Sequence, residues 1–275
     1  MQTLSLRDEQ YVGASEKTSL YDLNIPDNWN RKLLIFSHGY MGYKDWGAWN
    51  LMEDYFVQRG FGFLKYNVSH NGGTVENGID FPDLKSFSMN SYSNELLDME
   101  SIIDLARQKA VGLEHIYLIG HSRGGGMVLL QSKNEAVSKI AALAPICDIE
   151  KRFPSGEDLE EWKTNGLRYT TNGRTKQQMP HTYDQYEDFI RNRSRLNIEE
   201  YCTNANVPIC VIHGVDDPAV KIEEGETIAN WAGIDLIRIP NEQHTFGARQ
   251  PWTEKELPLG LKTACEHLLA FFENE

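Results

Sequence analysis

The stretch IGHSRGGG, residues 119–126, places Ser122 between glycines two positions before it and two positions after it. The run HIYLIG that precedes it predicts a strand, and GGGMVLL predicts the start of a helix. A sharp strand-to-helix turn holds the serine in an unfavourable backbone conformation, and Gly120 and Gly124 relieve the crowding around it. The hydroxyl then lies at a helix N-terminus, where the helix dipole favours negative charge. The five-residue pattern is common by chance, but in this context it predicts that Ser122 is a nucleophile.

A nucleophilic serine needs a general base, because a free hydroxyl is a poor nucleophile, and the base needs an orienting acid. In this type of strand-turn-helix site the chain order is serine, acid, histidine. His267 lies in an amphipathic stretch, and His181 lies in a polar segment. His213 ends a strand before any acid that could serve it. His244, in the loop NEQHTFG after the last expected strand, is therefore the predicted base.

The stretch VIHGVDDPAV, residues 211–220, offers two candidate acids after an expected strand. Asp217 precedes Pro218, which biases its backbone towards an extended conformation. One of the two acids is expected to be a turn or helix-capping residue. We favour Asp217 as the acid and leave Asp216 as the alternative.

Short apolar runs alternate with helix-like stretches along most of the chain, which is typical of a mostly parallel sheet flanked by helices. Strands are expected at 32–38, 60–67, 115–120, 139–145, 207–214 and 234–240. Helices are expected at 48–60, 94–109, 125–137 and 256–274. The first 25 or so residues predict two additional antiparallel strands.

Residues 148–203 depart from this pattern, because they are polar and aromatic and contain no convincing buried strand. A loop of this length within a compact domain is usually functional or carries its own helices. We expect a cap inserted between two core strands of a single domain, residues 1–275. A surface excursion without function is the alternative.

The composition limits the classes of partner. The chain has 275 residues, 40% of them hydrophobic, and a net charge of −13. This acidity argues against nucleic acid and against an anionic membrane surface as partners. The first ten residues lack the pattern of a signal peptide, and no apolar run approaches the roughly 18 residues of a membrane span. The cysteines show no metal-site spacing; they are Cys147, Cys202, Cys210 and Cys265. We expect a soluble protein of the reducing cytoplasm; its oligomeric state is open.

Four motifs carry a resemblance to a known family. They are SHGYMG (37–42), GHSRGG (120–125), HGVDDPAV (213–220) and QHTFG (243–247). On these motifs the chain resembles an α/β-hydrolase of the serine esterase type, similar to the cinnamoyl and feruloyl esterases among bacterial carboxylesterases. The resemblance implies the α/β-hydrolase fold. It also implies an oxyanion hole formed by the backbone N–H groups of Tyr40 and Arg123.

The expected activity is hydrolysis of carboxylic esters with small or aromatic acyl groups, through an acyl-enzyme and a triad of Ser122, Asp217 and His244. No metal and no organic cofactor is expected, and the partner is a small-molecule ester. A thioesterase, a peptidase or an acyltransferase would use the same triad. A ligand-binding protein without catalysis is the alternative from a different class.

The cap residues combine aromatic and polar side chains, as small-ligand pockets do. The candidate substrate-binding residues are Trp162, Tyr169, Arg174, Gln178, Met179 and Tyr183. The aromatic members could instead only hold the cap against the core.

Overall fold

The computed structural model describes residues 3–274 and is built around one eight-stranded sheet. Its strand order is β1-β2-β4-β3-β5-β6-β9-β10. The strands are β1 (Leu4–Val12), β2 (Thr18–Ile25), β3 (Lys32–Ser37), β4 (Gly62–Tyr66), β5 (His115–His121), β6 (Val137–Leu143), β9 (Ile209–Gly214) and β10 (Ile237–Ile239). The strands from β4 to β10 are parallel, whereas the β1–β2 and β2–β4 pairs are antiparallel. The α/β architecture and the two additional N-terminal strands agree with the sequence-based expectation.

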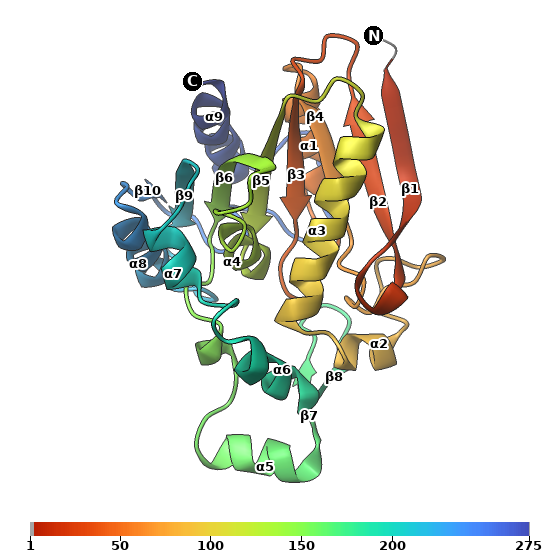
Figure 1. Cartoon of the computed structure of the whole chain (residues 1–275), viewed down its shortest axis with the longest axis vertical. Coiled ribbons are helices and arrows are strands. Elements are labelled where there is room, and N and C mark those ends of the chain that lie inside the picture. The colour runs from red at the N-terminus through yellow and green to blue at the C-terminus, as the bar shows by residue number, and fades with distance from the viewer. Residues whose placement is uncertain (1–2, 275) are drawn as a thin grey trace.

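Helices cover both faces of the sheet (Figure 1). They are α1 (Trp49–Val57), α3 (Tyr92–Lys109), α4 (Arg123–Leu129), α8 (Ile222–Ala232) and α9 (Leu259–Glu273), and the short helix α2 (Leu84–Ser88) packs instead against β8 (Gln178–Thr182). Side chains of α1 and α9 join one hydrophobic cluster, and those of α3, α4 and α8 join a second cluster on the other face. Because both faces are covered, Leu33 to Phe36 of β3 are all buried, and parallel strands in such a position need an unbroken apolar run.

The strand order reverses at β3, which determines where a site can lie. The chain goes from β3 through α1 to β4 on one side, and then returns through α3 to β5 on the other side. The loops that follow β3 and β5 therefore meet at the carboxyl ends of these two strands. In open parallel sheets this crevice is where ligands bind.

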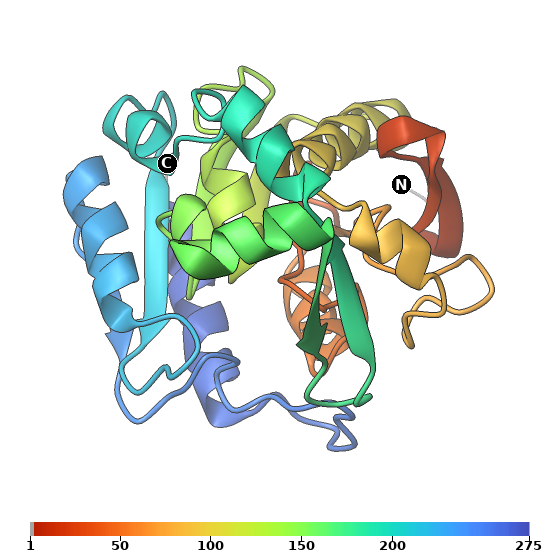
Figure 2. The same cartoon turned by 90° about the horizontal axis from the view of Figure 1, so that it is seen from below.

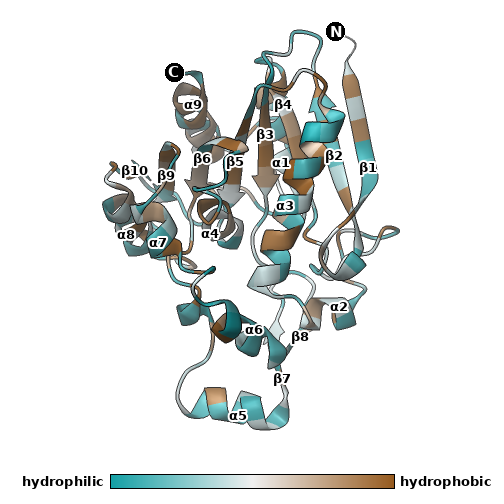
Figure 3. Cartoon of the chain, in the orientation of Figure 1, coloured by the Kyte–Doolittle hydropathy of each residue, from teal (hydrophilic) through white to brown (hydrophobic). Residues whose placement is uncertain are grey.

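The segment that we call the cap segment, residues 148–203, lies between β6 and β9. It contains the short 3-10 helix η2 (Glu150–Arg152), α5 (Glu157–Asn165), β7 (Leu167–Thr171), β8 (Gln178–Thr182), α6 (Asp184–Asn192) and α7 (Ile198–Thr203). Its helices and hairpin lie below the carboxyl ends of the central strands, and the view from below shows them in front of the sheet (Figures 1 and 2). Helices α5 and α6 are largely hydrophilic, in contrast to the central strands (Figure 3).

Three local expectations are corrected by the structure. The helix expected at 125–137 ends at Leu129, because the chain then turns around Asn134, whose side chain accepts the N–H of Ala136. The hairpin β7–β8 and the helix α8 were not expected from the sequence. The run QMPHT contains a proline and no hydrophobic alternation, so nothing in it predicts a strand. Among residues 3–274, no helix is long and apolar enough to span a membrane.

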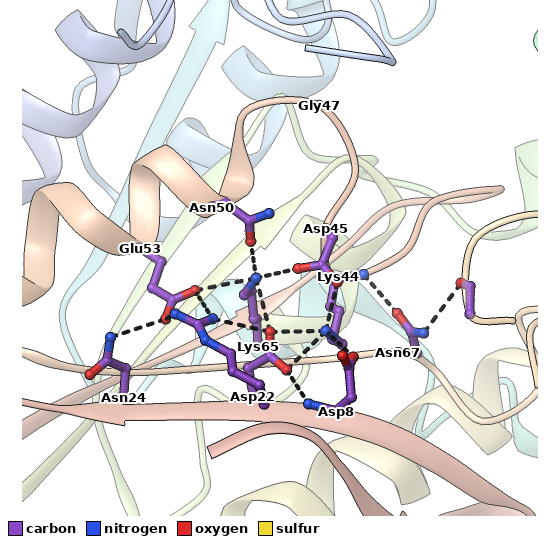
Figure 4. Close-up of polar contacts among 12 residues, drawn as sticks. Asp8, Asp22, Asn24, Lys44, Asp45, Gly47, Asn50, Glu53, Lys65 and Asn67 are labelled. Atoms are coloured by element: carbon purple, nitrogen blue, oxygen red, sulfur yellow. Dashed lines mark hydrogen bonds and ion pairs between the residues drawn. The ribbon is translucent and has the colours of Figure 1, made fainter. Parts of the chain in front are cut away.

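A cluster of charges with a buried centre joins β1, β2, β4 and α1, on the opposite side of β3 from β5 (Figure 4). We call it the charge network; it consists of Arg7, Asp8, Asp22, Lys44, Asp45, Glu53 and Lys65. The ammonium of Lys65 lies 3.1 Å from Asp22 and 3.2 Å from Glu53, and it also contacts Asp45. Lys44 lies 2.9 Å from Asp22 and 2.6 Å from Asp45. Burial alone would raise the pKa of Asp22, but Lys65 and Lys44 lower it to about 2. The charges in this network are thus paired with each other.

Candidate active site

Ser122 lies in the strained turn that the sequence predicts. Its backbone has φ 57° and ψ −118°, between the end of β5 and the start of α4. A side chain at Gly120 would place its Cβ 2.2 Å from the carbonyl oxygen of Gly124, and a Cβ at Gly124 would lie 2.4 Å from that of Ser37. These distances are far shorter than any real Cβ contact, so both glycines are sterically required. The predicted role of the two glycines is confirmed, and positive φ at a serine marks a site that stores strain.

His244 and Asp217 form a hydrogen-bonded pair near this turn. Nδ1 of His244 lies 2.7 Å from Oδ2 of Asp217. The other carboxylate oxygen of Asp217 accepts the N–H groups of Ala219, at 2.8 Å, and Val220, at 2.9 Å. Burial opposes ionisation, but hydrogen bonds from His213 and His244 lower the pKa of Asp217 well below its usual range. The carboxylate is therefore held in its charged form.

Asp216 has a different environment. Its side chain is exposed, and its backbone N–H donates to the carbonyl of Glu242. The two candidate acids thus differ in their contact with the histidine: Asp217 lies against His244, and Asp216 does not.

His213 is a residue of this site that the sequence analysis set aside. Its ring is fully buried, and Nε2 lies 2.9 Å from the carbonyl oxygen of Val220 and 3.3 Å from Oδ2 of Asp217. Because the carbonyl can only accept, the proton is on Nε2 and is donated to Val220, and the carboxylate of Asp217 lies beside this N–H. Nδ1 packs so closely on Gly225 that a Cβ there would lie 2.5 Å away. The spacing His-x-x-x-Asp in HGVDD is the signal that could have indicated this contact.

Two further histidines hold the backbone of the site. Nε2 of His121 lies 2.8 Å from the carbonyl oxygen of His244, and the two rings lie 4.7 Å apart. Burial and the neighbouring His244 lower the pKa of His121 to about 3. Nδ1 of His38 lies 2.9 Å from the carbonyl oxygen of Gly39, while its Nε2 accepts the N–H of Val68. Burial lowers the pKa of His38 to about 4, so it shapes the loop after β3 as a neutral ring.

The two expected oxyanion donors lie beside Ser122. A Cβ on Gly39 would lie 3.0 Å from Cβ of Ser122, so the loop that contains Tyr40 packs directly on the turn. Arg123 is the first residue of α4, where backbone N–H groups have no partner within the helix. Among residues 3–274, neither the N–H of Tyr40 nor that of Arg123 donates a hydrogen bond. Both groups are thus available to a ligand.

Ser122 and His244 line two cavities at this edge of the sheet. The main cavity has a volume of about 480 Å³ and is lined by the loop residue Tyr40 and by the cap segment. Its cap-segment residues are Arg152, Phe153, Arg168, Thr170, His181 and Gln185. The small cavity, of about 150 Å³, lies against Trp46 and Trp49. The serine and the histidine thus lie where two parts of one substrate could be held.

The cap segment contacts the loop after β3, which contains Tyr40, through a hydrogen bond. The hydroxyl of Tyr40 lies 2.8 Å from Nε2 of His181, whose Nδ1 lies 3.1 Å from the side-chain oxygen of Gln185. Burial lowers the pKa of His181 to about 4, so the ring is neutral near pH 7. The amide oxygen of Gln185 accepts from Nδ1, and Nε2 therefore accepts from Tyr40.

The six cap residues proposed from the sequence lie elsewhere: of the described residues that line the main cavity, none is Trp162, Tyr169, Arg174, Gln178, Met179 or Tyr183. Trp162 is buried, and its indole N–H donates to the carbonyl of His181. Tyr183 packs against Trp162, with ring centroids 5.4 Å apart. Met179 is buried among Phe81 and other aromatic rings. Trp162 and Tyr183 thus pack within the cap segment, and Met179 packs against Phe81 outside it. The alternative interpretation was that the aromatic residues hold the cap against the core.

The other three side chains point away from the main cavity. Tyr169 is 58% exposed, Gln178 pairs with Thr171 across the hairpin, and Arg174 forms an ion pair with Asp80. Arg168 and Thr170, the neighbours of Tyr169 on β7, do line the cavity. Alternate residues of a strand face opposite sides. Without a prediction of β7 and its exact register, the sequence cannot tell which of its residues face the cavity.

Comparisons with known proteins agree with this architecture. The sequence pattern of the prolyl oligopeptidase family matches residues 49–257, about three quarters of the chain. The structure is similar to that of Est1E from Butyrivibrio proteoclasticus with ferulic acid bound, with a TM-score of 0.70 and 17% identity, covering 96% of this chain and 98% of the other. A putative hydrolase from Agrobacterium vitis has a TM-score of 0.71 and 16% identity, with 99% of both chains covered.

A dienelactone hydrolase from Anabaena variabilis is also similar, with a TM-score of 0.64 and 16% identity over 99% of this chain and 98% of the other. No curated protein matches the sequence. At these identities the structural similarities establish the α/β-hydrolase fold, and the residues themselves must carry any argument about chemistry.

Proposed function

This chain belongs to the prolyl oligopeptidase family and is an α/β-hydrolase, and from this premise we propose that it cleaves carboxylic esters of small or aromatic acyl groups by nucleophilic catalysis. The observation that carries the proposal is the geometry at the carboxyl edge of the sheet. There the strained Ser122 lines the same cavities as His244, whose ring is bonded to the buried Asp217.

Each residue of the proposed triad has a defined role. Because Nδ1 of His244 bonds to Asp217, Nε2 is the nitrogen that removes the proton of the Ser122 hydroxyl. The serine oxygen then attacks the acyl carbon, and the protonated histidine gives its proton to the leaving alcohol. A water molecule, deprotonated by the same histidine, releases the acid from the acyl-enzyme.

The backbone N–H groups of Tyr40 and Arg123 are the proposed donors to the carbonyl oxygen as it becomes negative. Their proposed role is supported by the absence of other acceptors in the described residues and by the contact of the Gly39 loop with Ser122. One such donor contributes about 3–4 kcal/mol to the stabilisation of a transition state. His181, which binds the hydroxyl of Tyr40, connects this loop to the cap segment.

We also propose that residues 148–203 act as a cap, because six of them line the main cavity. The four cysteines are all free and buried, which fits our proposal of a reducing cytoplasm. A peptidase is the second candidate activity, because the family takes its name from an oligopeptidase. Thioesterase and acyltransferase activities would use the same residues.

Turnover of chromogenic substrates tests the proposal. Nitrophenyl esters of increasing acyl length, methyl ferulate and an aminoacyl nitroanilide are compared by kcat/KM, for the wild type and for Ser122→Ala. We expect turnover of the short or aromatic esters and a loss of turnover on the order of 10⁶-fold in kcat in the variant, as for the nucleophile of other serine hydrolases. Preferred turnover of the nitroanilide would favour the peptidase. Activity of Ser122→Ala within about tenfold of the wild type would exclude the assigned nucleophile.

A further inference from the structure

The main cavity has a positive lining in an acidic protein. The chain has 40 acidic and 27 basic residues, but among the described residues that line this cavity there are three arginines and no aspartate or glutamate. Two of the arginines have acidic partners outside the lining. Arg123 lies 3.0 Å from Glu95, and Arg152 lies 2.5 Å from Glu224. Their charges are therefore already neutralised by the protein.

Arg168 is the third arginine, and it has no such partner. Among residues 3–274, no carboxylate lies within ion-pair distance of its guanidinium, and its buried Nε has no hydrogen-bond partner. The guanidinium lies over the ring of Trp162, 4.6 Å from the centroid. Burial lowers the pKa of Arg168. An arginine nevertheless stays charged in proteins, so the cavity contains one uncompensated positive charge.

The surroundings of Arg168 do not offer a substitute for a carboxylate. It pairs across the hairpin with His181, which is neutral near pH 7 because burial lowers its pKa to about 4. The groups that act against this lowering of its pKa are the phenols of Tyr40 and Tyr92, and burial raises the pKa of both, which keeps them uncharged near pH 7. A half-buried charge without a partner is costly to the fold, and an anionic ligand would remove that cost.

We propose that Arg168 binds a carboxylate on the part of the substrate that occupies the main cavity, so that the substrates are esters with a second, anionic end. This inference rests on the proposed esterase function. A guanidinium presents a planar fork that a carboxylate matches with two hydrogen bonds. Tyr92, Phe153 and Val220, which line the same cavity, would pack against the hydrocarbon between the carboxylate and the ester. Because the cavity contains one unpaired cation, we expect the ligand to carry one negative charge.

A pair of esters that differ only at one end tests the proposal. Mono-4-nitrophenyl adipate has a carboxylate where 4-nitrophenyl hexanoate has a methyl group. At pH 7 we expect kcat/KM to be higher for the adipate ester by about 10-fold or more, as for a hydrogen bond to a charged group. Arg168→Met should reduce the ratio of the two kcat/KM values by about 10-fold. Arg168→Lys keeps a charge without the fork and should retain part of the preference.

Arg174→Met is the matched control, because Arg174 belongs to the same hairpin region but pairs with Asp80 outside the cavity. The ratio of the two kcat/KM values should not change in this variant.

A second pair, 4-acetoxybenzoate and methyl 4-acetoxybenzoate, places the carboxylate on the alcohol part. A carboxylate preference that depends on Arg168 in this pair supports the proposal and assigns the main cavity to the alcohol. If neither pair shows a preference for the carboxylate, or if Arg174→Met removes it and Arg168→Met does not, the proposal is overturned.

Calorimetry on Ser122→Ala separates this proposal from the proposed function, because the variant should leave both esters intact. We expect the adipate ester to bind about 10-fold more tightly than the hexanoate ester, and the added substitution Arg168→Met to remove the difference. If the wild type hydrolyses neither ester but this binding difference is present, the anion site stands and the esterase assignment falls. Equal binding of the two esters within both pairs overturns the anion site, whatever the turnover.

Discussion

The charge network and the main cavity both place cations inside the protein, but they differ in what surrounds these cations. Lys65 is fully buried and contacts Asp22, Glu53 and Asp45. Arg168 lines an open cavity and contacts no carboxylate among residues 3–274. Ser122, at the edge of the sheet where Arg168 lies, lines two cavities.

This difference distinguishes charges that maintain the fold from groups that await a ligand. In the charge network each buried ion is balanced by its neighbours, so removing one of them leaves an uncompensated charge. At the carboxyl edge of the sheet, the strained serine, the two available N–H groups and the unpaired guanidinium are free to bind a ligand. Substitutions in the first region should therefore act on stability, and those in the second on catalysis and binding.

After the loss of the nucleophile itself, the largest effect is expected from the acid of the proposed triad. Asp217→Asn should lower kcat on the order of 10⁴-fold, because only a carboxylate holds the histidine in the tautomer that can accept the serine proton. Asp216→Asn is the matched control, and its kcat should stay close to that of the wild type since Asp216 is exposed and does not contact His244. Steady-state kinetics on both variants decides the assignment. The reverse ranking would transfer the role to Asp216.

The next effect is expected in the charge network. Lys65→Met should lower the free energy of unfolding by about 3–5 kcal/mol, because Asp22 and Glu53 would lose a buried counter-ion. The kcat of the folded fraction should not change. Lys151→Met removes an exposed pair with Asp148 and should cost less than about 1 kcal/mol. Urea denaturation measures both variants. If folded Lys65→Met protein kept its stability but lost kcat, the claim that the charge network acts on stability and not on catalysis would be contradicted.

The residues of the proposed triad could be singled out from the sequence because their signals are local, whereas the surroundings of the two cations could not. Gly120, Ser122 and Gly124 lie within one turn, and Pro218 distinguishes Asp217 from its neighbour. Lys65, in contrast, lies in the apolar strand β4, and its partners Asp22 and Glu53 come from β2 and α1. No local pattern around it indicates that it is buried and paired.

The lining of the main cavity was missed for a related reason. Arg168 faces the cavity because β7 pairs with β8 in one register, which the polar cap sequence did not predict. The aromatic pattern of the segment pointed instead to Tyr169, its neighbour on the opposite face. His213 was set aside because it precedes the acid in the chain, although the turn brings its ring back to Asp217. Residues that are close in the sequence thus predicted the turn at Ser122 correctly, but they did not predict which side chains line the main cavity.

The smallest effect concerns the pH dependence of stability. The pKa of His181 is about 4 in the fold and about 6.5 in the unfolded chain. Between these pH values the unfolded state binds more protons, so this histidine lowers the free energy of unfolding as the pH falls. Relative to the wild type, His181→Gln should gain up to about 1 kcal/mol per pH unit between pH 6.5 and 4.

Asp22→Asn provides the contrasting control from the charge network. The folded pKa of Asp22 is about 2, and its ordinary value of 3.8 also lies below this window. The stability difference between the wild type and Asp22→Asn should therefore stay constant from pH 6.5 to 4. Below pH 4 it should decrease, because the stabilisation from a carboxylate with a lowered pKa is lost as the pH falls through the folded value. Denaturation curves at four pH values measure both differences; a constant difference for His181→Gln would contradict the assigned burial of that ring.

Covalent labelling of Ser122 tests the central claim most directly, that this strained serine is the reactive nucleophile. The protein is incubated with diethyl 4-nitrophenyl phosphate, which transfers a diethylphosphoryl group to an activated serine and releases nitrophenolate, and the peptides are then analysed by mass spectrometry. We expect one label per chain, on the peptide that contains Ser122, with a parallel loss of esterase activity and no label in Ser122→Ala. A label on another residue, or full esterase activity without any label on Ser122, would contradict the account.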